Sequence, residues 1–187
     1  GSEMCIRDRD NGIGENTITA VIDWANDSIK AMQKNLDRSR ANNSGELRQS
    51  LGKNFNKEPL IKGGVLTLEI EAEEYWKFVD EGVQGVGGKS DITGKLMPNK
   101  NTTSSFKYKG EKPPFAEIEK LVKTKIRSSG NDVFTTLNIR EGIYRKGTKA
   151  TNFVSDVLTS KRTKQLQDAI VESMNDDIII AINGVIG

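Results

Sequence analysis

An apolar stripe near the start of the chain is the feature that most constrains its fold. Six apolar residues recur at alternating spacings of four and three: Ile18, Ile22, Ala25, Ile29, Met32 and Leu36. This spacing places them on one face of a helix over 17–38, with Asn16 or Thr17 as its N-cap. A second stripe over 161–182 has the same rhythm: Leu166, Ile170, Met174, Ile178 and Ala181. The sequence therefore predicts amphipathic helices near both ends, each burying one face against other elements.

A strand-like rhythm follows the first helix. Leu47 and Leu51 lie in a short segment that is either a helical turn or the start of a strand. Gly63–Gly64 is typical of a turn, and after it Leu66, Leu68 and Ile70 alternate with polar residues. Period two with one apolar face predicts a half-buried strand.

An aromatic turn and a long glycine-rich stretch occupy the middle of the chain. Four apolar residues, Tyr75, Trp76, Phe78 and Val79, crowd into what we expect to be a helical turn ending at Gly82. A strand that continues through Phe78 is the alternative. Residues 82–113 carry six glycines and few apolar side chains, so they form a functional or disordered connection. Phe106–Tyr108 indicates a short returning strand, which would make this stretch an extended hairpin.

Two further helices and an extended link complete the pattern. Pro113–Pro114 opens a helix that Ser128–Gly130 ends, and a second helix covers 132–146 with Gly147 as its stop. The link over 148–159 carries Phe153. We expect one α+β domain over 16–187, with its helices packed on a small antiparallel sheet and with 82–113 as a loop insertion. Residues 1–15 are interpreted as a disordered or appended tail.

The composition excludes several classes of site. The 187 residues contain no histidine, which removes the commonest general base and metal ligand. A single cysteine, Cys5, allows neither an intrachain disulfide nor a thiolate cluster. The 28 basic and 26 acidic residues leave a net charge of +2, a small excess spread along the chain rather than the basic cluster of a nucleic-acid binder. No apolar run approaches the roughly 20 residues of a membrane helix. We expect no metal, cofactor, small-molecule substrate or membrane contact.

Two motifs suggest chemistry, and each has a simpler interpretation. Gly82–Ser90 resembles a phosphate-binding loop that would use Lys89 and Ser90, but it has five residues between its first glycine and Gly88–Lys89, where the motif has four. A flexible glycine loop is favoured over a phosphate-binding enzyme. Acids also gather at Glu69, Glu71, Glu73, Glu74, Asp80 and Glu81, and again at Asp176–Asp177. We expect solvated acids at both places rather than a catalytic pair.

Short basic groups leave a nucleic-acid interpretation open. Lys107 and Lys109 alternate with Phe106 and Tyr108, an arrangement in which bases stack on rings and phosphates attract lysine. Arg145 and Lys146 would join them in a nucleic-acid-binding accessory protein. A solvated hairpin is the favoured interpretation.

Three segments, in order, resemble the tail-completion or head–tail joining proteins of long-tailed bacteriophages. Residues 43–51 (NSGELRQSL) are similar to the small-residue step and basic-apolar segment that follow the first helix in that family. Residues 75–82 (YWKFVDEG) are similar to its aromatic-acid-glycine signature. Residues 143–154 (IYRKGTKATNFV) resemble its phenylalanine-containing step into the last helix, although they lack the proline that often accompanies it. The chain also departs from simpler members in its helices over 114–146.

The resemblance implies a structural protein without catalysis. It would be made in the cytoplasm of a bacterial host and assembled into the virion as a ring, as a homo-oligomer that contacts other phage head or tail proteins. Nucleic acid would meet it only as the passing genome. The guessed self-assembly contacts are Tyr75, Trp76, Phe78, Gly82, Phe106, Tyr108 and Phe153. Each of Tyr75, Trp76, Phe78 and Phe153 has core packing as the favoured alternative.

Overall fold

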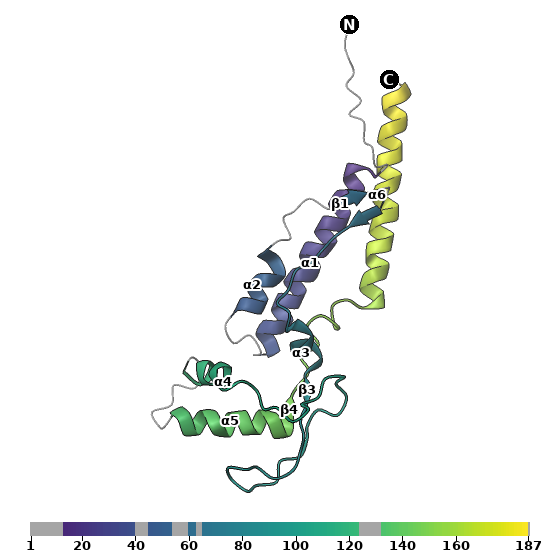
Figure 1. Ribbon diagram of the computed structural model, residues 1–187. Coiled ribbons are helices and arrows are strands. Elements are labelled where there is room, and N and C mark those ends of the chain that lie inside the picture. The colour runs from purple at the N-terminus through teal and green to yellow at the C-terminus, as the bar shows by residue number, and fades with distance from the viewer. Residues whose placement is uncertain (1–12, 40–44, 54–59, 63–64, 124–131, 187) are drawn as a thin grey trace.

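The computed structural model describes residues 13–39, 45–53, 60–62, 65–123 and 132–186. Over these residues the chain is α+β, as the sequence predicts, with six helices and two short antiparallel ladders. The helices are α1 (Glu15–Ser39), α2 (Glu46–Lys53), α3 (Trp76–Glu81), α4 (Phe115–Leu121), α5 (Asp132–Lys146) and α6 (Ser160–Ile186). The strands are β1 (Leu60–Lys62), β2 (Val65–Thr67), β3 (Val83–Gln84) and β4 (Gly147–Thr148), and β1 pairs with β2 as β3 pairs with β4. The molecule is elongated, with α1, α2 and α6 in one half and α4, α5 and the long loop in the other (Figure 1).

The predicted terminal helices are both present, and they pack on each other. The α1 helix begins at Glu15, earlier than expected, and the carbonyl of Gly14, just before it, accepts a hydrogen bond from the Ile18 N–H. The other residues of the expected tail, 1–12, lie outside the described part of the chain. The first turn of α1 is closed from α6: Asp177 accepts hydrogen bonds from the Asn16 and Thr17 N–H groups and from the Thr17 hydroxyl.

This arrangement corrects the expectation that Asp177 is a surface acid and that Asn16 or Thr17 caps the helix alone. Burial by itself raises the pKa of Asp177, but the hydrogen bonds from Thr17 and Asn16 outweigh it and lower that pKa. A side chain on Gly14 would collide with the same carboxylate. Asp177 of α6 therefore caps the N-terminus of α1, which joins the two helices.

Replacing Asp177 with alanine should cost about 1 kcal/mol of unfolding free energy, as the loss of a helix N-cap does. Urea denaturation followed by circular dichroism measures the change. Asp176→Ala is the matched control, since Asp176 is exposed and its loss should leave the urea midpoint within error. Equal effects of the two substitutions would show that the contact does not stabilise the helix pair.

The main core is built on the predicted stripe of α1. Its fully packed members are Ala25, Ile29, Met32 and Leu36 of α1, Leu47 and Leu51 of α2, and Phe153 and Val157 of the link before α6. Leu47 and Leu51 thus belong to a helix, which resolves the alternative left open by their spacing. We call α1, α2, α3, α6 and the segment 60–74 the body.

The predicted strand shows the expected alternation of buried and exposed side chains, but its paired part is shorter than predicted. Only Val65–Thr67 pairs, with β1, yet burial alternates residue by residue as far as Ala72. Leu68, Ile70 and Ala72 pack against the main core while Glu69 and Glu71 face solvent. The extended backbone therefore keeps the period-two pattern after the ladder has ended. The turn predicted at Gly63–Gly64 lies outside the described residues.

The structure supports the helical interpretation of the aromatic turn. The α3 helix ends at Gly82, which has a φ of 70°. A Cβ at this position would collide with the carbonyl oxygen of Thr148, so glycine allows both the left-handed turn and the close approach of β4. The stop predicted for the α4 helix, at Ser128–Gly130, lies outside the described residues.

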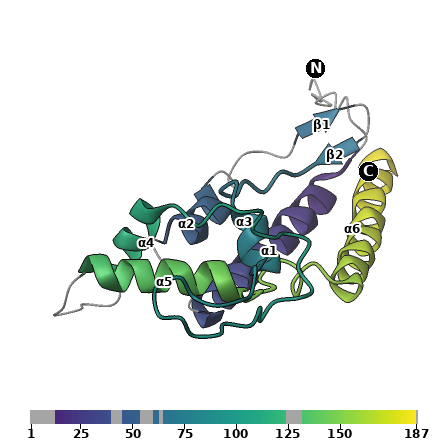
Figure 2. The same cartoon turned by 60° about the horizontal axis from the view of Figure 1, so that its bottom comes forward.

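The stretch 82–113 is a loop whose return is parallel rather than antiparallel. Gln84 forms an isolated parallel bridge with Lys107, while the antiparallel partner of β3 is β4, from beyond α5. The expected hairpin is therefore wrong in its pairing, although Phe106–Tyr108 does return beside β3. Figure 2 shows this loop passing along α5. Together 82–150 form a second unit, which we call the lobe.

Candidate assembly surface

Two segments that are distant in the sequence form one unit where the body meets the lobe. The buried carboxylate of Asp80, at 3% exposure, accepts hydrogen bonds from the Val154 N–H at 2.8 Å and from the N–H and hydroxyl of Ser155. The Asp80 carbonyl accepts from the Thr151 and Asn152 N–H groups. The expectation that Asp80 is a solvated acid is therefore wrong. Its role is to fold the link before α6 into the turn that carries Phe153 into the core.

The guessed assembly residues fall into three environments. Phe153 is fully buried, Gly82 is buried at the end of α3, and Trp76 is partly buried against the main core. Tyr75 and Phe78 remain 39% and 47% exposed. In this fold, therefore, Phe153 and Gly82 face the inside of the subunit, and only the exposed aromatic residues have area to offer a neighbour.

The aromatic residues of the loop are packed on rings of their own chain. Phe106 meets Phe78 edge to face, with 4.5 Å between ring centroids, and Tyr108 lies 5.8 Å from Tyr144. Burial raises the pKa of Tyr108. Because these rings are engaged with each other, they do not form an open platform for stacking bases.

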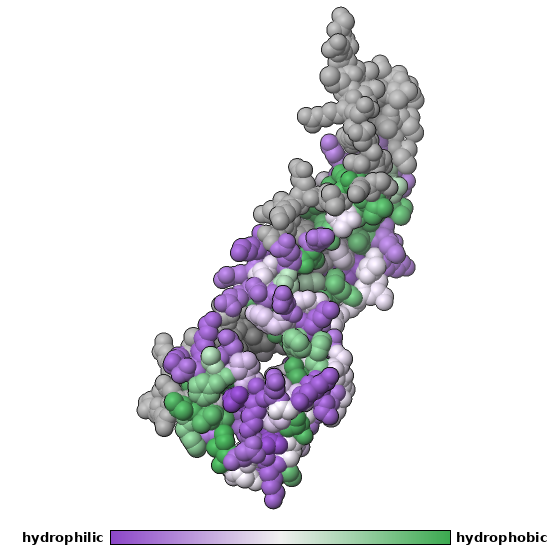
Figure 3. Space-filling view, viewed as in Figure 1, coloured by the Kyte–Doolittle hydropathy of each residue, from purple (hydrophilic) through white to green (hydrophobic). Residues whose placement is uncertain are grey.

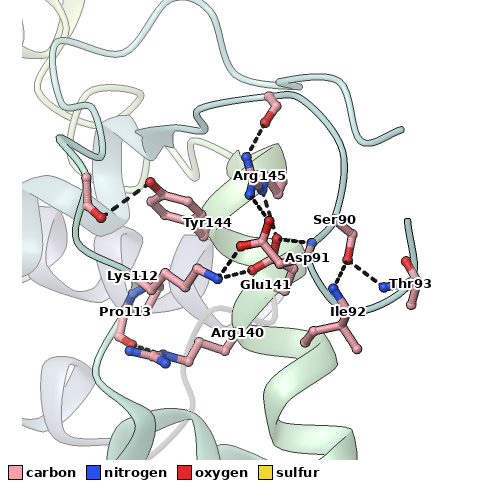
Figure 4. A network of polar contacts seen from close by, with 12 residues as sticks. Ser90, Asp91, Ile92, Thr93, Lys112, Pro113, Arg140, Glu141, Tyr144 and Arg145 are labelled. Carbon is pink, nitrogen blue, oxygen red and sulfur yellow. Dashed lines mark hydrogen bonds and ion pairs between the residues drawn. The ribbon is translucent and has the colours of Figure 1, made fainter. Parts of the chain in front are cut away.

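A buried glutamate organises the lobe. The Glu141 side chain of α5 is 1% exposed, and its Oε1 accepts hydrogen bonds from Arg145 Nε at 2.8 Å and from the Asp91 N–H at 3.0 Å. Among the described residues Oε2 has no aligned hydrogen-bond donor, and Lys112 neutralises it as a charge at 2.7 Å. Lys112 and Arg145 both also pair with Asp91 (Figure 4). The network fastens the start and the end of the loop to one helix.

The electrostatics of this network favour the ionised glutamate. Burial by itself raises the pKa of Glu141, but Lys112, Arg145 and the Asp91 N–H together outweigh it and hold that pKa at about 2. Glu141 and Asp91 in turn raise the pKa values of Lys112 and Arg145. These four charged side chains pair with one another, so the cluster holds the loop in place.

The segment that resembles a phosphate-binding loop has other uses here. The Ser90 hydroxyl oxygen accepts hydrogen bonds from the Ile92 and Thr93 N–H groups, which closes a turn (Figure 4). Lys89 bridges to Leu96 through the backbone, and no helix begins at Ser90, since the next one starts at Phe115. The geometry therefore lacks the strand–loop–helix context of a nucleotide site.

Charge is segregated between the lobe and the rest of the chain, a feature that the total of +2 conceals. Residues 82–150 contain 14 basic and 6 acidic side chains, a net of +8, which leaves −6 for the remainder. Seven lobe lysines make no ion pair within the described part of the chain: Lys89, Lys95, Lys100, Lys107, Lys109, Lys146 and Lys149. Counting charge by segment rather than in total would have revealed this from the sequence.

Three of these lysines surround a hollow of about 520 Å³ at the end of α5. Lys100, Lys146 and Lys149 line it together with the apolar Ile139 and Ile143 and with Gly142, and no acidic residue is among the lining. Figure 3 shows hydrophilic residues gathered over the loop beside an apolar patch over α4 and α5. The lobe thus offers an apolar floor inside a positive rim, which suits an apolar side chain flanked by carboxylates.

Comparison with protein-family models, with curated proteins and with solved structures finds no match to this chain. In the described residues, no helix has the length and apolar character needed to cross a membrane. In the same residues, no three Asp, Glu or Cys side chains gather closely enough to hold a metal ion.

Proposed function

We propose that the chain is a non-catalytic structural subunit of a tailed-phage virion, which completes the tail or joins it to the head as part of a ring. The observation that carries this proposal is the contact between two of the three segments that resemble the tail-completion family. Asp80 of the segment 75–82 holds the backbone at Val154 of the segment 143–154, and β3 pairs with β4 beside them. Residues of these motifs thus hold each other rather than line a substrate cleft.

The buried charges of the lobe support the same proposal. Glu141, Lys112, Arg145 and Asp91 neutralise one another and fasten the loop, which gives the chain a defined outer shape. A ring subunit works by presenting one surface to its neighbour, and identical head-to-tail contacts close when the rotation closes. The charge separation between lobe and body supplies two unlike surfaces on one molecule.

The decisive experiment is inactivation of the gene in a phage that carries it. We expect electron microscopy of the lysate to show filled heads and complete tails that remain separate, with infectivity restored by the wild-type gene supplied in trans. The purified chain should form closed rings as its concentration rises. Normal particles in the absence of the protein, or turnover of a substrate by the purified chain, would contradict the proposal.

A nucleic-acid-binding accessory protein is the second candidate, and the seven unpaired lysines favour it. Of the basic residues expected to act there, Lys107, Lys109 and Lys146 are free of ion pairs within the described residues, but Arg145 is held by Glu141 and Asp91. This candidate requires DNA affinity that falls steeply with salt concentration.

A further inference from the structure

Beyond the exposed Lys161 and Lys164 at its start, α6 carries three acids on one exposed face, the charge opposite to that of the lobe. Asp168, Glu172 and Asp176 recur every four residues, so they form one exposed ridge. None of the three makes an ion pair within the described residues. Ser173 and Asp177 mark the side of α6 that packs on α1, and each directly follows a residue of the ridge. The ridge therefore lies beside the packed side, about a quarter turn away, and is exposed to solvent.

One exposed apolar side chain borders the acidic ridge. Val171 is 61% exposed and lies three residues after Asp168, one turn along the same side of α6. Met174 is 49% exposed but lies across the helix from Glu172. An apolar residue beside an unpaired carboxylate is the chemical complement of the hollow, with its floor of Ile139 and Ile143 and its rim of Lys100, Lys146 and Lys149.

The two surfaces cannot meet within one molecule. Figure 1 shows α6 in the upper half and the junction of α5 with β4 in the lower half. Building on the function proposed above, we propose that the acidic ridge of α6 in one copy docks into the lysine-rimmed hollow of the next. Val171 then covers the apolar floor, and the carboxylates of Asp168 and Glu172 face the lysines.

A second copy explains more of the surface than nucleic acid does. A phosphate backbone would use the lysines but would leave the apolar floor and the acidic ridge without a role. The packing of Phe106 on Phe78 and of Tyr108 on Tyr144 also removes the rings on which bases stack. A contact between unlike poles repeats from copy to copy and generates a ring or a filament. A near-zero total charge favours such association.

The test exchanges charges between the two poles. The lobe variant is Lys100→Glu with Lys149→Glu, and the helix variant is Asp168→Lys with Glu172→Lys. All four side chains are exposed, so both variants should fold, as circular dichroism would verify. The control is Lys34→Glu with Lys53→Glu, which alters net charge as much as the lobe variant does but lies on α1 and α2.

Sedimentation velocity at about 0.1 M and about 1 M salt measures self-association, since screening shortens from about 10 Å to about 3 Å between them. We expect the wild type and the control to associate at low salt. Each pole variant should associate at least about tenfold more weakly, because like charges then oppose each other. An equal mixture of the two pole variants should assemble again, because unlike poles are restored between different molecules.

Four results would overturn the docking proposal. One is a wild type that stays monomeric at low salt, and another is a mixture that fails to assemble although the wild type does. The third is wild-type binding of duplex DNA, lost in the lobe variant, without self-association; this would assign the lobe to nucleic acid. Rings that form equally well in the wild type and in both pole variants would also refute this contact while leaving the virion role intact. Normal head–tail joining after gene inactivation would separately contradict the virion role.

Discussion

Replacing Phe153 with alanine is expected to lower the unfolding free energy by about 3–5 kcal/mol, the range for removing a large side chain from a packed core. Phe153 is 0% exposed and belongs to the main core with Ile29 and Leu36 of α1. Its truncation removes apolar burial and leaves a cavity beside the turn that Asp80 folds. Because domains of this size are stable by only about 5–15 kcal/mol, the variant should be close to unfolding.

Urea denaturation, followed by the fluorescence of the two tryptophans, measures this loss. Phe78→Ala is the matched control, since Phe78 is 47% exposed and contacts Phe106 at the surface. It should cost about 1 kcal/mol, mostly from the lost ring pair. Equal urea midpoints for the two alanine variants would show that Phe153 stabilises the fold no more than the exposed Phe78 does.

The second large effect is expected at Glu141. Glu141→Gln keeps the shape of the side chain but removes the charge that Lys112 and Arg145 neutralise. Severing a fully buried ion pair costs about 3–5 kcal/mol, and we expect somewhat less here because Lys112 and Arg145 retain access to water. Hydrogen exchange at the Asp91 N–H should speed up, since the ionised Glu141 is its hydrogen-bond acceptor on α5.

The same glutamate should make the lobe sensitive to acid. Its pKa in the folded chain is about 2, below the ordinary value of 4.5, so its contribution is fully present above about pH 4.5. That contribution falls as the pH drops from 4.5 toward 2, where the carboxyl protonates in the folded state as well. Exchange rates measured at pH 7, 4 and 2.5 should therefore converge for the wild type and Glu141→Gln. A constant difference down to the lowest pH would argue against an ionised Glu141.

Periodicity predicted the parts of the fold that depend on burying one face of a segment. The stripe of α1 follows from spacing alone, and the alternation of Leu66, Leu68 and Ile70 correctly gave their facing. The α6 helix was also predicted, but Met174 of its expected buried stripe is 49% exposed. Periodicity did not predict which strands pair with each other, because a ladder depends on contacts between residues distant in the sequence. Nothing near Gln84 indicates that its antiparallel partner is Gly147, beyond α5.

Individual acids were harder to predict than whole elements. Asp80, Glu141 and Asp177 have the same local composition around them as solvated carboxylates, and only their tertiary partners distinguish them. Glu141 did carry one local signal, since Arg145 follows it by four residues on the same helix face. The α5 helix also buries Thr136 and Glu141 while Leu137 is 37% exposed, which an apolar-stripe argument cannot anticipate.

The pairing of β3 with β4 has a consequence for how this protein can change. Gln84 and Gly147 are direct neighbours across the ladder, so the segment from Gly85 to Lys146 starts and ends at the same place in the fold. Material inserted, trimmed or exchanged between those two points would alter the outer contour of a subunit while the α1–α6 scaffold kept its own contacts. Replacing the segment between these two points would thus change the contacts that the subunit makes without changing its α1–α6 scaffold.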